Sequence, residues 1–190
     1  MKKSTVNFQK EFKLWKACSK DEFRPVMQHV FFKDGYAYAS DSHVLVRVPL
    51  EECTTFEEEE RELLNGCLLH GSMLKYIVGF ETVLVETDED GAVYLKAKAG
   101  ENTITVKLGK NGDALTYPKA EELLQKHRNC DRSPIQKIGI NPKFVASLTE
   151  ALGTDNLKFE FSDEKSAIFA RPLNGFSNAI GLIMPLVIMD

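Results

Sequence analysis

The chain has 190 residues, which suits one large domain or two small ones, and its 43% hydrophobic and 27% charged residues are those of an ordinary globular protein. A net charge of -4 excludes a globally basic nucleic-acid-binding protein, although a local basic face remains compatible with it. No apolar run reaches the length of a membrane-spanning helix, and the start of the chain has no apolar signal segment. The cysteines (Cys18, Cys53, Cys67 and Cys130) form no paired motif. We therefore expect a cytoplasmic protein with free thiols and no membrane partner.

The first part of the chain predicts one strand, one helix and three further strands. Thr5 to Phe8 is the first strand, and Gln9 to Lys20 is the helix. Aromatic side chains recur at helical spacing on one face, and four lysines share the opposite face: Lys10, Lys13, Lys16 and Lys20. This lysine face is either a surface for a polyanion or simply a solvated face.

The three strands that follow are separated by clear turn signals. After Arg24-Pro25, the β-rich runs are Val26 to Phe32, Tyr36 to Ala39 and His43 to Val48. Asp34-Gly35 is a typical hairpin turn between the first two. The acidic stretch from Glu51 to Glu62 then predicts an exposed connector with a short helix, which Thr54 or Thr55 could cap.

The same order of elements occurs twice more. The second unit is predicted to contain a strand at Cys67–Leu69, a helix at Ser72–Phe80 capped by Ser72, and strands at Thr82–Glu86, Ala92–Ala97 and Thr103–Leu108. A polar stretch from Lys119 to Arg132 predicts a brief helix or a linker. The third unit is predicted to contain a strand at Ile135–Ile140, a helix at Lys143–Leu152 opened by Asn141-Pro142, and strands at Leu157–Phe161, Ala167–Arg171 and Ala179–Met184.

Repetition of a strand-helix-three-strand unit is the main organisational feature of the sequence. Three such units predict an α+β fold with antiparallel sheets and helices on one face. We expect two domains: residues 1–125 with two units, and residues 126–190 with the third.

The residues that carry chemistry do not form a catalytic pattern. The histidines (His29, His43, His70 and His127) lack metal-ligand spacing, and no nucleophile, phosphate-binding or zinc-hydrolase motif occurs. Asp41 beside His43 hints at acid-base chemistry, but their place on a turn that enters a strand favours a structural hydrogen bond, and no nucleophile is near them in the sequence. We therefore predict a binding module, with no enzymatic activity, no cofactor and no metal.

Several segments together resemble one known family. These are the turn Ala39-Ser40-Asp41-Ser42-His43-Val44-Leu45, the strand region Arg24 to Phe32, the exit segment Leu115-Thr116-Tyr117-Pro118, the stretch Ile138 to Val145, and the C-terminal Ile183-Met184-Pro185-Leu186. In this order they resemble the bacterial DNA sliding clamp, the beta subunit of DNA polymerase III. A family member has three domains of two units each, whereas this chain has three units. The chain also carries Ser42 where the family has glycine, and Val44 where it has arginine.

The resemblance implies a hydrophobic cleft that binds linear peptides from DNA polymerases and other DNA enzymes. The matching positions are Met27 in a strand, Ser40, Ser42, His43, Val44 and Leu45 in the turn, Pro118 and Leu123 on the exit segment, and Met184, Pro185 and Leu186 at the end. Methionine, leucine and proline suit an adaptable apolar groove. The alternative is that these residues only seal the contact between the two halves of the chain.

The resemblance also implies DNA contact and assembly. Helices of the family face double-stranded DNA without reading its sequence, and the matching basic residues are Lys10, Lys13, Lys16, Lys20, Lys75 and Lys143. We expect a homo-oligomer that works as a processivity or tethering factor in DNA replication or repair. The second hypothesis is a peptide-binding adaptor or competitor that forms no ring, and an enzyme with an unrecognised site ranks last.

Overall fold

The computed structural model describes residues 6–128, 137–163, 165–173, 175 and 177–187. The helices are α1 (Leu50–Cys53), α2 (Glu58–Leu63), α3 (Gly71–Ile77), α4 (Ala120–Arg128) and α5 (Pro142–Ala151), with 3-10 turns η1 (Leu14–Lys16) and η2 (Pro25–Gln28). The strands are β1 (His29–Lys33), β2 (Tyr36–Ser40), β3 (Val44–Pro49), β4 (Cys67–His70), β5 (Thr82–Thr87), β6 (Val93–Ala99), β7 (Asn102–Lys107), β8 (Gly109–Lys110), β9 (Leu157–Glu160), β10 (Ile168–Pro172) and β11 (Ile180–Ile183).

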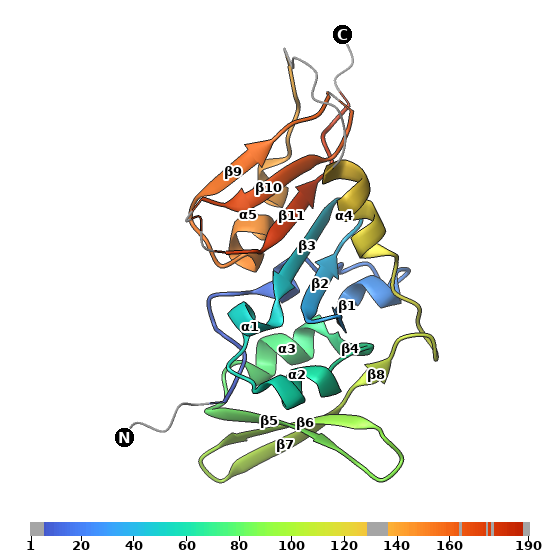
Figure 1. Ribbon diagram of the computed structural model, residues 1–190, viewed down its shortest axis with the longest axis vertical. Helices are drawn as coiled ribbons and strands as arrows, with labels where there is room; N and C mark the ends of the chain where they lie inside the picture. Colours follow the sequence, from blue (N-terminus) through green and yellow to red (C-terminus); the bar gives the residue numbers. More distant parts are fainter. Residues whose placement is uncertain (1–5, 129–136, 164, 174, 176, 188–190) are drawn as a thin grey trace.

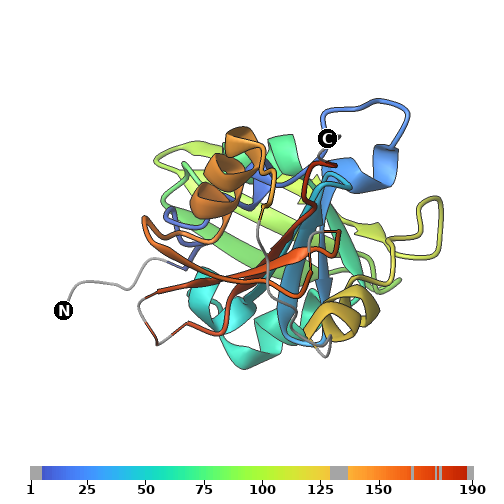
Figure 2. The same cartoon turned by 90° about the horizontal axis from the view of Figure 1, so that it is seen from above.

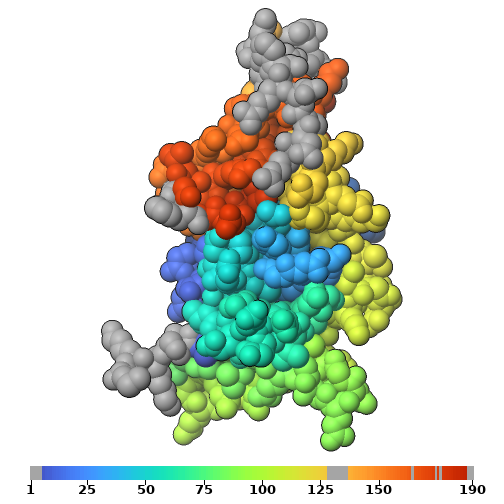
Figure 3. All heavy atoms as spheres, in the orientation of Figure 1, coloured from blue at the N-terminus to red at the C-terminus, as the bar shows by residue number. Residues whose placement is uncertain are grey.

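Two antiparallel sheets contain these strands (Figure 1). The larger sheet has eight strands in the order β8-β4-β1-β2-β3-β11-β10-β9, and the smaller has three in the order β5-β6-β7. The α+β class is therefore confirmed. We call residues 6–49 the first unit, residues 67–108 the second unit and residues 137–187 the third unit. In Figure 3 the third unit (orange to red) lies above the first (blue to cyan), and the second (green) lies below.

Pairing between β3 and β11 joins the first and third units into one continuous sheet. Leu182 lies opposite Leu45 and Ile183 lies opposite Val44 in this ladder. The first and second units are joined differently, because β4 of the second unit pairs with β1 of the first. Conversely, the amide of Val83 on β5 donates to the carbonyl of Val6 in the first unit at 2.7 Å.

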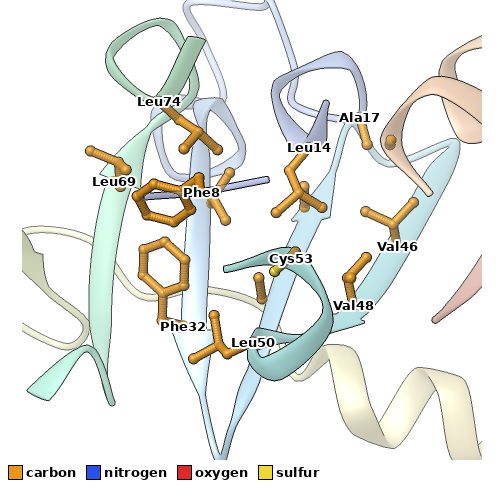
Figure 4. Packing of buried hydrophobic residues seen from close by; sticks show 14 of the residues in the cluster. Phe8, Leu14, Ala17, Phe32, Val46, Val48, Leu50, Cys53, Leu69 and Leu74 are labelled. Carbon is orange, nitrogen blue, oxygen red and sulfur yellow. The ribbon is translucent and has the colours of Figure 1, made fainter. Parts of the chain in front are cut away.

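The main hydrophobic core lies against one face of the large sheet (Figure 4), and residues of the small sheet, such as Val83 and Leu95, also belong to it. Phe8, Phe32 and Phe56 pack in its centre, with the rings of Phe8 and Phe56 edge to face at 5.0 Å. Side chains alternate along β1, so Phe32 enters this core while Phe31 points to the other side of the large sheet. There Phe31 joins a second cluster that contains Tyr117 and Leu124.

The helices divide between the two faces of the large sheet. The face that carries the main core is covered by α3, η1 and α5, whereas α4 covers the opposite face. Figure 2 shows α5 (orange) and α4 (gold) on opposite sides of the strands. The expectation of helices on one face is therefore wrong for α4. Polar Lys119 to Arg132 gave no sign of this packing, because only Ala120 and Leu124 anchor the helix on the sheet.

The helix expected from Gln9 to Lys20 does not form. Only η1 is helical in this stretch. The amide of Gln9 bonds to the carbonyl of Cys53 at 2.8 Å, and the amide of Lys13 bonds to the carbonyl of Glu150 at 3.0 Å. These long-range partners take backbone donors that a helix would have used, so the aromatic spacing reflects packing of an irregular segment.

Several local predictions, on two strand positions and on helix caps, also differ from the structure. Met27 lies on η2 rather than in a strand, because η2 precedes β1. In the described part of Ile135–Ile140, Gly139 makes a single bridge with Leu186 and no strand forms. Glu57 caps α2 in place of a threonine, and His70 rather than Ser72 caps α3. The cap of α5 by Asn141 is confirmed, since its side chain accepts from the amide of Lys143 at 3.0 Å.

Candidate functional site

An apolar pocket of about 250 Å³ opens where α4 lies against one end of β2, β3 and β11. Its lining comes from parts of the chain that are far apart in sequence: Met27, Ser40, Ser42, His43, Val44, Leu45, Tyr117, Pro118, Ala120, Leu123, His127, Ala167, Leu182 and Met184. We call this pocket the cleft. It spans the junction between the first and third units, so continuous pairing of β3 with β11 is what brings its two sides together.

The floor of the cleft is buried and its rim is accessible. Leu45 and Leu182 lie opposite each other in the sheet and are 7% and 5% exposed. Leu123 on α4 and Met184 after β11 are 46% and 41% exposed. A ligand in the cleft would therefore cover apolar rim side chains that water now contacts, which is the usual driving force for binding.

Polar contacts fix α4 against the sheet. Arg47 on β3, whose side chain is only 12% exposed, donates to both carboxylate oxygens of Glu121 at 3.0 Å. The hydroxyl of Tyr38 donates to the same carboxylate at 3.1 Å. Burial of Glu121 opposes its ionisation, but hydrogen bonds from Gln125, Arg47 and Tyr38 outweigh burial and lower its pKa. Glu121 therefore remains ionised at neutral pH and holds the wall of the cleft in place.

The turn from Ser40 to Val44 is tightly hydrogen-bonded. The side chain of Asp41 accepts from the amides of His43 and Val44 at 2.8 and 2.7 Å. This accounts for Asp41 as a turn residue, and the His43 ring instead stacks on Phe144 with centroids 5.0 Å apart. Ser42 has φ +80°, the left-handed region that favours glycine. Its hydroxyl is held by Arg24 and contacts the sulfur of Met27 at 3.0 Å.

Two buried polar atoms lie among the residues that line the cleft. The hydroxyl of Tyr117 and Nδ1 of His127 have no hydrogen-bond partner among residues 6–128, 137–163, 165–173, 175 and 177–187. Burial lowers the pKa of His127, with Lys126 acting in the same direction and Asp163 opposing it. His127 is therefore neutral at pH 7, and the cleft presents an uncharged, mostly apolar wall.

The structure gathers the sequence-predicted cleft residues into this pocket except Pro185 and Leu186. The amide of Leu186 bonds to the carbonyl of Gly139 at 2.8 Å, which turns the chain away after Met184. The lining residues that the sequence did not assign to the cleft are Tyr117, Ala120, His127, Ala167 and Leu182. Alternation along β11 could have indicated Leu182, because its neighbours Gly181 and Ile183 point to the opposite face.

The predicted lysines do not share one helix face. Lys13 and Lys16 both bind Glu150 of α5 at 3.1 Å, and these bonds lower the pKa of Glu150. A second, polar hollow of about 880 Å³ lies on the side of the large sheet that carries η1, α3 and α5. It is bordered by Lys16, Lys20 and Lys75, together with acidic residues. We call it the polar hollow. Lys10 borders a different depression beside Asn7, and Lys143 is exposed at the start of α5.

In the part of the chain that the structure describes, no three His, Cys, Asp or Glu side chains are grouped so that they could hold a metal ion. Over the same residues, no helix is both long and apolar enough to cross a membrane.

Comparison with known proteins places the fold. No protein-family model matches the sequence, and no curated protein matches it. Solved structures do match: the DNA polymerase III beta chain of Streptococcus pneumoniae at 15% identity with a TM-score of 0.60, covering 99% of this chain and 66% of that one. The DNA polymerase sliding clamp of Bacillus subtilis has 14% identity and a TM-score of 0.60, covering 100% and 66%. The beta clamp of Helicobacter pylori, solved with diflunisal, has 16% identity and a TM-score of 0.58, covering 96% and 66%.

The fold is therefore that of bacterial DNA sliding clamps. The chain spans about two thirds of the length of the clamps that it matches, so the resemblance seen in the sequence is to a shortened form of the clamp.

Proposed function

We propose that this protein is a sliding-clamp-like accessory factor of DNA replication or repair that binds linear peptide segments of DNA enzymes in the cleft. The observation that carries the proposal is the apolar pocket at the junction of β3, β11 and α4. Its partners would be DNA polymerases or other proteins that carry clamp-binding segments. The chain itself performs no catalysis in this proposal.

The shape and chemistry of the cleft favour a short peptide. Apolar side chains at the rim, Leu123 and Met184, can close around one or two large anchors from a ligand. Flexible methionines at Met27 and Met184 allow the rim to adapt to different apolar anchors. The hydroxyl of Tyr117 and Nδ1 of His127, which have no hydrogen-bond partner among the described residues, could form hydrogen bonds with polar groups of the peptide. An extended peptide with few apolar anchors fits these features better than a rigid protein surface.

Fluorescence anisotropy with labelled short peptides tests the proposal. The probe peptide carries two leucines and a phenylalanine, and its matched control has serine at those positions. We expect saturable binding of the first peptide only, and competition by the same peptide without a label. Absence of saturable binding by any leucine- and phenylalanine-bearing peptide at the highest soluble concentration would exclude peptide capture.

DNA contact is the second part of the proposal. The basic residues that border the polar hollow are Lys16, Lys20 and Lys75. They could contact the phosphates of the DNA backbone without recognising the base sequence. Glu150 offsets part of this charge through Lys13 and Lys16. We therefore expect weak DNA binding that declines steeply as salt increases.

A specific observation supports an alternative, in which the protein is an adaptor or competitor that binds peptides without encircling DNA. All the residues that line the cleft belong to this one chain, and the lysines that border the polar hollow take no part in that lining. Retention on nicked circular DNA, with release after linearisation, would favour the tethering factor. Peptide binding without such retention would favour the adaptor.

A further inference from the structure

The third unit is an incomplete copy of an arrangement that the first and second units complete between them. Each unit of that pair has a segment before its helical element and a strand after it. The segment before the helical element of each unit contacts the strand after the helical element of the other unit. Thus β4, which precedes α3, pairs with β1, which follows η1. In return, Val6, which precedes η1, accepts a hydrogen bond from β5, which follows α3. The third unit has no such counterpart among the described residues.

Both missing contacts leave backbone groups available on the third unit. Within the described residues β9 pairs only with β10, so its outer edge is open. The amide of Leu173 bonds to the carbonyl of Asn156 at 3.0 Å, and alternation along an antiparallel ladder then directs the backbone groups of Leu157 and Phe159 to this open edge. Similarly, the carbonyl of Gly139 faces Leu186, which leaves Ile138 and Ile140 facing the other way.

Burial of the side chains shows the same difference. The core-facing residues of β1, Val30 and Phe32, are both 0% exposed, and Val83 on β5 is also 0% exposed. At the corresponding positions of β9, Leu157 and Phe159 are only partly buried. Further apolar side chains of the third unit are likewise only partly buried against the main core: Ile138, Ile140, Val145 and Phe161. The third unit therefore presents half of a core beside an open sheet edge.

We propose that two copies of this chain associate about a two-fold axis through their third units, so that residues 137–140 of each copy pair with β9 of the other. The pairing of β4 with β1 supplies the register. Leu69, which precedes the cap of α3, lies opposite Val30. By the same rule Ile140, which precedes the cap Asn141, lies opposite Leu157 of the partner subunit.

This register is self-complementary. It places Ile138 opposite the partner's Phe159, on the apolar side, and Lys137 opposite the partner's Glu160, a carboxylate that also pairs with Lys158 and Arg171 of its own chain. Because the axis is two-fold, each apolar contact and each pair of opposite charges occurs twice. The α5 helices of the two copies become neighbours through Val145 and Thr149, which lie on the side of α5 away from Glu150 and η1. A second copy fits because each chain offers both the segment and the edge.

Sedimentation equilibrium of single charge reversals tests the proposal. Lys137→Glu alone and Glu160→Lys alone would each place like charges together at both symmetric positions, so each should weaken dimerisation at least about tenfold. A mixture of the two variants should restore a dimer, because both contacts then join opposite charges. Lys98→Glu makes the same charge change at an exposed position on β6, in the second unit, and should leave dimerisation unchanged.

The mixing result separates this interface from a folding defect, since a destabilised variant would not regain dimerisation from an equally destabilised partner. A strictly monomeric wild-type chain at the highest soluble concentration would overturn the proposal. A dimer that both reversals leave intact would also overturn it, because the two copies would then meet elsewhere. Circular dichroism spectra of both variants, taken alongside, should match the wild type. Peptide binding in the cleft is a separate measurement and should persist in either case.

Discussion

The two faces of the large sheet carry hollows of opposite character. The cleft on the α4 side is apolar, and its rim residues Leu123 and Met184 remain accessible. The polar hollow on the α3 and α5 side is larger, but its charges compensate one another, as in the pairs of Lys16 with Glu150 and Arg24 with Asp21. His43 borders both hollows. The α4 side therefore exposes apolar surface that a ligand could cover, whereas the charges on the α3 and α5 side largely neutralise one another. Peptide binding is for this reason better supported than DNA binding.

The same substitution on the two faces should separate stability from binding. Leu124 on α4 and Leu148 on α5 are 1% and 0% exposed, so replacement of either by alanine should cost about 2–5 kcal/mol in free energy of unfolding. Only Leu124→Ala should also weaken peptide binding, because α4 supplies Leu123 and His127 to the cleft. Urea denaturation and peptide anisotropy at low temperature, where both variants are folded, measure the two effects. Equal losses of peptide affinity would contradict the division between the faces.

A charge at the rim should break the cleft without disturbing the core. Met184→Glu places a carboxylate on a rim that is 41% exposed, and we expect about a thirtyfold loss of peptide affinity, which corresponds to about 2 kcal/mol. Leu186→Glu is the matched control, since Leu186 is 50% exposed but lies outside the pocket. Similar losses in both variants would mean that the cleft extends along the chain past Met184.

The sequence predicted the strands well because alternation and turn signals are local. Tyr36 to Ala39 and His43 to Val48 correspond to β2 and β3, and the helix opened by Asn141-Pro142 is α5. The helix at Gln9 to Lys20 failed because its backbone donors go to Cys53 and Glu150, which are distant in sequence. Propensity carries no information about such partners.

Of the residues that line the cleft, the sequence predicted only those in or near the segments that resemble the clamp family. The turn residues and Met184 belong to the motifs that carry the family resemblance. Ala167 and Leu182 were missed because their membership depends on which face of the sheet α4 covers. That face is decided by tertiary packing of Ala120 and Leu124, in a stretch whose composition is polar. Pro185 and Leu186 were included because they continue the motif, yet the bridge between Gly139 and Leu186 draws the chain aside.

Removing one carboxylate should sharpen the contrast in charge. Glu150→Gln releases Lys13 and Lys16 on the polar face, so DNA binding should tighten several-fold at low salt, and its dependence on log salt should steepen by up to about two units. Glu122→Gln is the control on the α4 side, where Glu122 binds Lys119 at 2.9 Å. Electrophoretic mobility shifts at several salt concentrations measure both. No change with Glu150→Gln would argue against DNA contact on this face.

The smallest expected effect is a pH dependence from His127. Burial lowers its pKa from 6.5, so the folded protein binds fewer protons than the unfolded chain in the pH range just below 6.5. Stability should be independent of His127 above that pH and should fall as pH decreases through it. His127→Gln should flatten the fall in Tm, although His29, whose pKa burial also lowers, leaves a residual slope. An identical pH profile in the variant would show that His127 is not the group that titrates.

The methionine methyl groups provide the most direct test of peptide capture in the cleft. Met27 and Met184 line the cleft, whereas Met73 lies on α3 and packs on the main core. In NMR spectra of protein with labelled methionine methyls, titration with the leucine- and phenylalanine-bearing peptide should shift Met27 and Met184 and leave Met73 unchanged. A shift of Met73 alone, or no shift of Met27 and Met184 at saturation, would contradict the account.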